Sequence, residues 1–329
     1  MNVADLPTPT LLIDADALDH NLTEMAAALP GRRLRPHIKA HKCTSLARRQ
    51  AETGHDSFTC ATIKECEGMA AAGLGGDLLL ANEVLDASRL GALVEGGARV
   101  TVAVDSPQTV DAAVAGGVRE VLIDVNVGLP RCGILPQAAG QLADQARRRG
   151  LEVRGVMGYE GHVVGLVDAA DRSAKCQESM EQLLAAHADV GGDLISAGGT
   201  GTYAINTWAN EIQAGSYALM DTAYNQLNLP FRQALFVLAT VISTAEAGWS
   251  VADAGLKCFG MDHGIPALSN ADVWFCSDEH TTFAPPRTVG DRVMLVPAHV
   301  DPTMAYHERA YIFRGDEVVD VWPIDLRGW

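Results

Sequence analysis

The stretch "RVTVAVDSPQTVDAAVAGGVREVLIDVNVG", residues 99–128, contains one complete strand–helix–strand unit. Two apolar runs rich in β-branched residues, 99–105 and 120–128, flank an Ala-rich segment. Ser106 is a typical helix N-cap, Pro107 fits the first helical position, and Gly116 falls where a left-handed C-cap would end the helix. Near-continuous apolar strands that alternate with helices indicate a parallel sheet covered by helices. The stretch therefore predicts a βαβ unit.

The same rhythm recurs along the first two thirds of the chain. Counting the two runs above, eight strand-like runs alternate with amphipathic Ala-rich segments. The other six are 33–40, 57–61, 77–82, 153–161, 193–199 and 211–220. Eight βα units in about 200 residues are typical of a TIM barrel. We therefore predict an α/β protein whose larger domain is a (β/α)8 barrel.

The rhythm changes near residue 235. Short apolar runs then follow one another, separated by Gly, Pro and Asp turns, without spacers of helical length. This pattern predicts a second, smaller all-β domain. The boundaries are placed at 12–235 for the barrel and 236–329 for the β domain. The strand-like N-terminal run "PTPTLLIDA" fits either domain by its pattern alone.

Composition favours small-molecule chemistry. The chain has 329 residues, 48% of them hydrophobic, and a formal charge of -16, which opposes non-specific attraction to nucleic acid or anionic lipid. The N-terminus has no basic segment followed by an apolar one, and no apolar run is long enough to span a bilayer. A cytoplasmic location is therefore the default expectation. The seven scattered cysteines lack CxxC spacing, which fits reduced thiols.

The segment "RLRPHIKAHKCTS", residues 33–45, is unusually cationic for the entry to a core. If 33–40 is a strand, side chains alternate between its two faces. The inward face then carries the polar side chains, which are Arg35, His37, Lys39 and His41. Lys39 falls at the carboxyl end of this strand, where barrel enzymes place their sites. A lysine desolvated there has a lowered pKa and is a usable nucleophile; the alternative is an ion pair with a buried acid.

Two glycine-rich loops follow the expected strands 7 and 8. They are "SAGGTGT" (196–202) and "QAGSYALM" (213–220), and barrels commonly hold phosphate in these two loops. Their candidate phosphate-binding residues are Gly199, Thr200, Gly215, Ser216 and Tyr217. Together with an inward lysine, they indicate a phosphorylated carbonyl cofactor, and pyridoxal 5'-phosphate (PLP) fits best.

A family resemblance extends this interpretation. The stretches "RPHIKAHK", "DVNVGLPRCGI", "GYEGH", "GGTGTY", "QAGSYALMD", "ALFVLATV", "DAGLK" and "VPAHVDPT" resemble, in order, the D-threonine aldolase family of alanine-racemase-like (fold-type III) PLP enzymes. The resemblance implies a homodimer, an N-terminal strand (1–11) within the β domain, and a divalent metal beside the cofactor. It also implies retro-aldol cleavage of β-hydroxy D-amino acids, such as D-threonine or D-allo-threonine, to glycine and an aldehyde.

The resemblance also assigns roles in the barrel. Lys39 matches the lysine that binds the cofactor aldehyde, and Arg131 matches the arginine near the cofactor's phenolic oxygen. Tyr159 and His162 in "GYEGH" match groups that contact the cofactor and the substrate side. The catalytic base stays open among His162, His37 and a metal-bound hydroxide.

The metal pair rests on the same resemblance. In a strand ending near residue 300, alternation would place His299 and Asp301 on one face. These residues match the family's metal ligands, and two protein ligands leave several positions for water and substrate. Such an open site suits Mn²⁺ or Mg²⁺, and the cation would lower the pKa of the substrate β-hydroxyl.

Four alternatives remain at this level. A metal-dependent D-serine or 3-hydroxyaspartate dehydratase would release ammonia and a keto acid, although that relative usually has cysteine where Asp301 stands. A 3-hydroxy-D-aspartate aldolase differs only in its side-chain pocket. A non-catalytic PLP carrier would use the barrel alone, and a sugar-phosphate-binding barrel would not need Lys39.

Overall fold

The computed structural model describes residues 1–329 and divides into two compact units. The α/β unit comprises Met25–Lys39, Leu46–Gly215 and Gly328–Trp329. The β unit comprises Met1–Glu24, Ala40–Ser45 and Ser216–Arg327. The chain passes between them within α1 (Ala15–Ala28), η3 (Ile38–Ala40) and α2 (Thr44–Glu52), and again after Gly215 and after Arg327. The fold class predicted from the sequence, a TIM-type α/β barrel with a smaller β domain, is confirmed.

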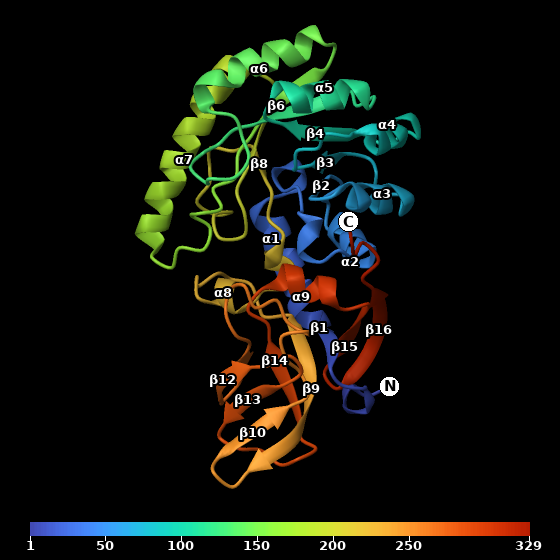
Figure 1. The fold of residues 1–329 in the computed structure, drawn as a ribbon, viewed down its shortest axis with the longest axis vertical. Helices are drawn as coiled ribbons and strands as arrows, with labels where there is room; N and C mark the ends of the chain where they lie inside the picture. The colour runs from blue at the N-terminus through green and yellow to red at the C-terminus, as the bar shows by residue number, and fades with distance from the viewer. The chain divides into compact units, whose positions relative to one another are not determined.

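The α/β unit is built on a seven-stranded parallel sheet in sequential order, β2 to β8. Figure 1 shows helices α3 to α7 along the outside of these strands. The strands are β2 (Phe58–Cys60), β3 (Leu78–Leu80), β4 (Val100–Val104), β5 (Glu120–Asp124), β6 (Glu152–Met157), β7 (Leu194–Ala197) and β8 (Glu211–Ile212). The helices are α3 (Ile63–Ala71), α4 (Ser88–Glu95), α5 (Pro107–Ala115), α6 (Pro136–Arg148) and α7 (Ala169–Val190), with η2 (Gly31–Arg33) before the sheet. Most strand residues are buried, as expected of strands covered by helices.

The strand predicted at 33–40 is not a strand. The segment makes single parallel bridges to both edge strands of the sheet, Leu34 to Ile212 and His37 to Thr59, and then turns into η3. Its backbone nevertheless bonds on both sides, because the amide of His37 donates to Ala214 O (3.0 Å) and the amide of Thr59 donates to Pro36 O (2.9 Å). The predicted strand at 211–220 was also too long, since it ends at Ile212.

The βαβ unit of residues 99–128 forms as predicted. Ser106 caps α5 by accepting a hydrogen bond from Thr109 N, and Pro107 opens the helix. The left-handed residue at its end is Gly117 (φ +81°) rather than Gly116. Gly116 is required by packing instead, because a Cβ on it would lie 2.5 Å from the carbonyl carbon of Ala87. A Cβ on Gly91 of α4 would in turn lie 1.7 Å from the Gly116 carbonyl oxygen. The two helices thus approach backbone to backbone.

The β unit contains a nine-stranded, mostly antiparallel sheet. Its main path is β12-β13-β10-β9-β1-β15-β16, and β14 pairs with both β9 and β11. The N-terminal β1 (Thr10–Asp14) lies parallel to β15 and antiparallel to β9. The remaining strands are β9 (Leu235–Ala245), β10 (Trp249–Ala252), β11 (Ala267–Leu268), β12 (Asp272–Cys276), β13 (Thr281–Ala284), β14 (Arg292–Val296), β15 (Arg309–Arg314) and β16 (Glu317–Pro323). Short helices are η1 (Val3–Asp5), η4 (Ser216–Ala218), α8 (Thr222–Asn225) and α9 (Val300–Tyr306).

Two further features concern the cysteines and the character of the helices. All seven cysteines are free thiols, and five of them are buried, as expected of small core residues. None of the helices combines the length and the apolar character needed to cross a membrane.

Candidate active site

Lys39 lies in η3, directly after the bridged segment. Because residues 34–37 run parallel to β2 and β8, Lys39 follows at the carboxyl end of the parallel sheet, the end that carries the sites of barrel enzymes. The side chain is half-buried. The backbone at Lys39 differs from the prediction. Lys39 lies in a 3₁₀ turn and not in a strand, so the alternation of side chains along a strand does not set its direction.

Arg131 and Tyr159 come from neighbouring loops at the same end. Arg131 lies in the loop after β5, and Tyr159 follows β6 by two residues. The Arg131 guanidinium carbon lies 5.4 Å from the centre of the half-buried Tyr159 ring, within cation–π range. The two candidates that the sequence placed in separate loops are therefore in contact.

His162 lies in the same loop as Tyr159 and is exposed. A Cβ on Gly128, which follows β5, would lie 3.0 Å from two atoms of the His162 ring. Gly128 also has a φ of +121°, which side chains rarely adopt. The glycine therefore makes room for the imidazole beside the β5 loop.

Glu160 is a buried residue that the sequence analysis missed. Its carboxylate accepts hydrogen bonds from Thr202 Oγ1 (2.8 Å), Gly198 N (3.1 Å) and Asn206 Nδ2 (3.2 Å). The side chain is fully buried. It joins the loop after β6 to the glycine-rich loop after β7. In the sequence, the one signal for this linking role is the position of Glu160 between Tyr159 and a glycine, directly after an apolar strand.

The glycine-rich loop 198–202 is braced from within. The amide of Gly199 donates to Thr202 Oγ1 at 3.2 Å, and Thr200 is buried. A Cβ on Gly199 would lie 3.6 Å from Cε2 of Tyr159, so this loop lies beside the Tyr159 ring. The amide of Gly199, one of the predicted phosphate-binding residues, is thus engaged by Thr202, and the amide of the neighbouring Gly198 is engaged by Glu160.

The second glycine-rich loop contains residues of both units. Gly215 ends the main segment of the α/β unit, and Ser216 opens η4 in the β unit. Tyr217 is fully buried, and its ring centre lies 5.6 Å from that of Phe231.

Acidic residues gather near Arg131 at the carboxyl end of the sheet. Burial, reinforced by the adjacent Glu83, raises the pKa of the Asp124 carboxyl well above its usual value. Burial and a hydrogen bond with Glu83 also raise the pKa of the Cys132 thiol to about 11. Asp124 therefore keeps its proton to a higher pH than an exposed carboxyl does.

The predicted metal pair lies at a helix start and not at a strand end. His299 is the N-cap residue of α9, and Asp301 lies in the first turn of that helix. His299 Nε2 lies 3.9 Å from Asp301 Oδ1, so the two side chains do face one another. The prediction of a strand here was wrong because the chain turns after β14 ends at Val296.

Two further residues at the metal pair were missed by the sequence analysis. Asp262, His263 and His299 each offer a ligand atom, and these atoms lie within 4.8 Å of one another. Burial acts to raise the pKa of Asp262, but the hydrogen bond and the charge of His299 together outweigh it, and the net shift of the pKa is downward. The signal in the sequence is the "MDHG" segment, 261–264, which carries an acid next to a histidine.

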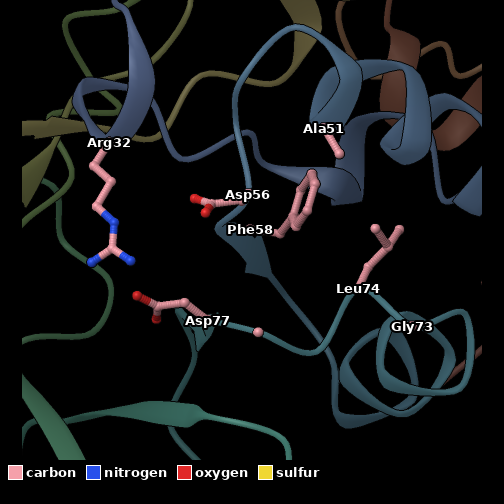
Figure 2. Close-up of a pocket in the computed structure, with 8 residues that line it drawn as sticks. Arg32, Ala51, Asp56, Phe58, Gly73, Leu74 and Asp77 are labelled. Atoms are coloured by element: carbon pink, nitrogen blue, oxygen red, sulfur yellow. The ribbon is translucent and has the colours of Figure 1, made fainter.

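The opposite end of the parallel sheet carries a separate pocket of about 240 Å³ (Figure 2). Phe58, at the start of β2, and Asp77, directly before β3, contribute to its wall together with Arg32 and Asp56. These are amino ends of strands. The pocket therefore does not belong to the candidate active site, because barrel sites form at the carboxyl ends.

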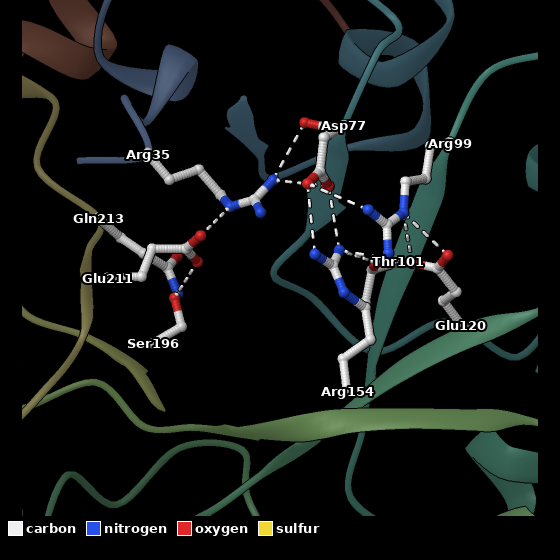
Figure 3. Close-up of polar contacts among 9 residues, drawn as sticks. All are labelled: Arg35, Asp77, Arg99, Thr101, Glu120, Arg154, Ser196, Glu211 and Gln213. Atoms are coloured by element: carbon white, nitrogen blue, oxygen red, sulfur yellow. Dashed lines mark hydrogen bonds and ion pairs between the residues drawn. The ribbon is translucent and has the colours of Figure 1, made fainter. Parts of the chain in front are cut away.

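The amino ends of the strands are also joined by an ion-pair network (Figure 3). Asp77 accepts hydrogen bonds from Arg154 Nη1 at 3.0 Å and Arg35 Nη1 at 3.1 Å, and Arg35 Nε lies 2.9 Å from Glu211 Oε2. Burial would raise the pKa of Asp77, but Arg154 and Arg35 outweigh it and hold the pKa at about 2. Arg35, one of the residues predicted to face inward, therefore has a structural role.

Comparison with known proteins identifies the class. The family model of the alanine racemase N-terminal domain matches residues 13–223. A second model, of a serine dehydratase domain, matches residues 234–313. The fold and the candidate site thus define an alanine-racemase-type barrel followed by a dehydratase-type β domain.

Individual relatives narrow the class. The D-threonine aldolase of Arthrobacter sp is 34% identical over 99% of this chain and 94% of its own. The 3-hydroxy-D-aspartate aldolase of Paracoccus denitrificans (strain Pd 1222) is 32% identical over 100% of this chain and 94% of its own. The crystal structure of D-threonine aldolase from Filomicrobium marinum matches with a TM-score of 0.91 at 34% identity, covering 98% and 96% of the two chains. The chain belongs to the D-threonine aldolase family and is an enzyme.

Proposed function

We propose that the chain cleaves β-hydroxy D-amino acids of the D-threonine type to glycine and an aldehyde, with PLP and a divalent metal. The observation that carries this proposal is the half-buried Lys39 at the carboxyl end of a barrel whose full-length relatives are named aldolases. The relatives support the reaction class, and the placement of the lysine supports the chemistry.

The residues present fit PLP. Lys39 offers an amine for the cofactor aldehyde, and Arg131 offers a cation at the same end of the sheet. A Cβ on Gly199 would lie 3.3 Å from Val164 and 3.6 Å from the Tyr159 ring, so a glycine here lets the backbone of the proposed phosphate loop lie close to Tyr159. When bound, PLP supplies an electron sink for the pair released from the broken Cα–Cβ bond.

The chain's own groups would bind, orient and move protons. Lys39 would hold the cofactor covalently. Arg131 would lie near the phenolic oxygen, and Tyr159 would contact the ring. Thr200, Gly199, Gly215, Ser216 and Tyr217 remain the proposed phosphate-binding residues.

His162 is the proposed base that accepts the substrate β-hydroxyl proton. It is exposed in a loop at the carboxyl end, where Gly128 leaves room for its ring. His37 is the less favourable choice because it is half-buried and its Nδ1 faces the amide of Lys39 at 3.5 Å.

His299 and Asp301 fit a divalent cation. An imidazole nitrogen and a carboxylate that face each other at 3.9 Å form a mixed N/O donor set with room for water. Mn²⁺ or Mg²⁺ is proposed, and such an ion lowers the pKa of a hydroxyl bound to it. The proposed assembly is a homodimer in the cytoplasm, and light scattering on the purified protein would test the dimer.

One experiment tests the reaction. Purified enzyme, supplied with PLP and Mn²⁺, is incubated with D- and L-threonine, both allo isomers and D-3-hydroxyaspartate, with and without chelator. Glycine plus an aldehyde from D substrates only, lost on chelation, is the expected result. Ammonia and a keto acid would establish the dehydratase alternative, and cofactor binding without turnover would establish the carrier.

A 3-hydroxy-D-aspartate aldolase is the second candidate. It is favoured by the 32% identity over the whole chain to the Paracoccus denitrificans protein of that name. The two candidates differ in whether the substrate side chain carries a carboxylate. A kcat/KM for D-3-hydroxyaspartate well above that for D-threonine would favour this second function.

A further inference from the structure

The carboxylate of Asp262 forms a hydrogen bond with one ring nitrogen of His299. Nδ1 of His299 lies 2.8 Å from Asp262 Oδ2 and 2.9 Å from Oδ1, although the residues are 37 positions apart in the chain. A carboxylate can only accept, so Nδ1 must carry the hydrogen. Neutral His299 is then in the tautomer whose Nε2 has a free lone pair. That Nε2 is the atom that faces Asp301, at 3.9 Å.

The backbone builds this arrangement. Gly260 forms an antiparallel bridge with His299, and its amide donates to Thr303 Oγ1 at 2.9 Å. Thr303 Oγ1 in turn donates to the His299 carbonyl at 2.6 Å. A Cβ on Gly260 would lie 2.1 Å from Cγ of Pro302, so only glycine permits the approach. Asp262 follows two residues later and is therefore delivered to His299 by a fixed segment.

His263 plays a different part. Its ring stacks on that of His299 with centroids 3.9 Å apart and planes 13° from parallel. A metal bound to an imidazole lies close to the ring plane, and one ion cannot lie in two parallel planes that are separated by a stacking distance. His263 therefore covers one face of His299 and is not a ligand of the same ion.

We propose that Asp262 is a positioning residue for the metal site: it holds His299 in the Nδ1–H tautomer and aims Nε2 at the cation shared with Asp301. The proposal rests on the metal role of His299 and Asp301 proposed above. A carboxylate behind a metal-binding histidine fixes the ring and makes it a better donor. Losing such a partner typically weakens metal binding 10- to 100-fold. The Asp262 side chain is 56% exposed, so we expect its loss to weaken metal binding by about tenfold, the low end of this range.

The first test reads the tautomer without metal. Histidine side chains are labelled with ¹⁵N, and long-range proton–nitrogen spectra are recorded on the PLP-loaded enzyme. The His299 signals are assigned by their loss in His299→Ala. Wild-type His299 should show the Nδ1–H form. Asp262→Ala should shift it towards the Nε2–H form that prevails in water. An Nε2–H signal in the wild type would overturn the proposal.

The second test measures Mn²⁺ affinity by calorimetry on the PLP-loaded enzyme. Asp262→Ala should weaken binding about tenfold. Asp262→Asn should weaken it less, because the amide oxygen still accepts the Nδ1 hydrogen. Asp272→Ala, which removes an exposed carboxylate of β12 in the same unit, should leave affinity unchanged.

The outcomes separate the two proposals. A wild-type enzyme that binds no Mn²⁺ would refute the proposed metal role. A wild type that binds Mn²⁺ while Asp262→Ala binds equally well would refute the role of Asp262 alone. A loss in His263→Ala as large as that in His299→Ala would make His263 a ligand and would contradict the stacking argument.

Discussion

Thr202 Oγ1 donates a hydrogen bond of 2.8 Å to the buried carboxylate of Glu160, and this contact joins the loop after β6 to the glycine-rich loop after β7. The amide of Gly198 reaches the other carboxylate oxygen. Tyr159, on the chain directly before Glu160, lies beside Gly199. One carboxylate therefore sets the spacing between a proposed ring contact and a proposed phosphate loop.

Replacing Glu160 should loosen this loop pair. Glu160→Ala would leave buried donors unsatisfied at a cost of about 1–3 kcal/mol each, so we expect a clear drop in melting temperature and weaker PLP binding. Glu160→Gln should retain more stability but also bind PLP less tightly. Both quantities are measured by thermal melts and absorbance titration. Cys176→Ala, whose thiol is 3.8 Å from Glu160, is the control and should change PLP affinity little. Unchanged PLP affinity in Glu160→Ala would contradict the argument.

Removing Lys39 should abolish covalent cofactor binding. Borohydride treatment of the wild type should fix PLP irreversibly to the protein, whereas Lys39→Ala should release it on denaturation and show no turnover. Mass spectrometry of the reduced protein gives the readout. Lys42→Ala, three residues away, should behave as wild type. Cleavage activity that survives in Lys39→Ala would refute the assignment.

Metal removal should stop turnover reversibly. Chelation should abolish glycine production from D-threonine, and added Mn²⁺ should restore it, because the proposed ion lowers the pKa of the β-hydroxyl. His299→Ala and Asp301→Ala should be inactive with Mn²⁺ at the concentration that saturates the wild type. Activity of the chelated wild type would argue against a metal in the reaction.

Acid should destabilise the α/β unit through Asp77. Its pKa is about 2 in the folded protein, below the usual 3.8, so its ionised form is stabilised by folding. This contribution, about 2 kcal/mol, is complete above about pH 5 and is progressively lost as the pH falls to about 2 and below. Denaturant melts at pH 2 to 6 should show this slope. Asp77→Asn should have a lower unfolding free energy at pH 6, and its unfolding free energy should depend less on pH between 2 and 6. An unchanged slope would mean that Arg35 and Arg154 do not hold the carboxylate ionised.

The close approach of α4 and α5 can be tested by comparing alanine substitutions at two glycines. Gly91→Ala would place a Cβ 1.7 Å from the Gly116 carbonyl oxygen, so we expect a loss of about 3 kcal/mol in unfolding free energy. Gly96→Ala should be tolerated, because its Cβ would lie 3.4 Å from its nearest neighbours, the carbonyl oxygens of Ala92 and Leu93. Chemical denaturation measures both. Equal stability of the two variants would contradict the close approach.

The local pattern of the chain determined the order of strands and helices. Ser106 and Pro107 begin α5 where expected, and the apolar runs at 57–61, 77–82 and 99–105 contain β2, β3 and β4. Capping and hydrophobic periodicity act over a few residues, so a sequence displays them directly. The candidate residues Lys39, Arg131 and His162 were predicted in the same way, from their position at or after the carboxyl end of an expected strand and from the family motifs.

Tertiary structure alone decided the rest. Residues 33–40 have the alternation of a strand, yet they form only single bridges to Ile212 and Thr59 before turning, because pairing depends on distant neighbours. The contact of Asp262 with His299 spans 37 positions, and that of Glu160 with Asn206 spans 46. No periodicity records such contacts. They arise only when packing brings distant segments of the chain together. Glu160 and Asn206 are buried, so each must find a partner there.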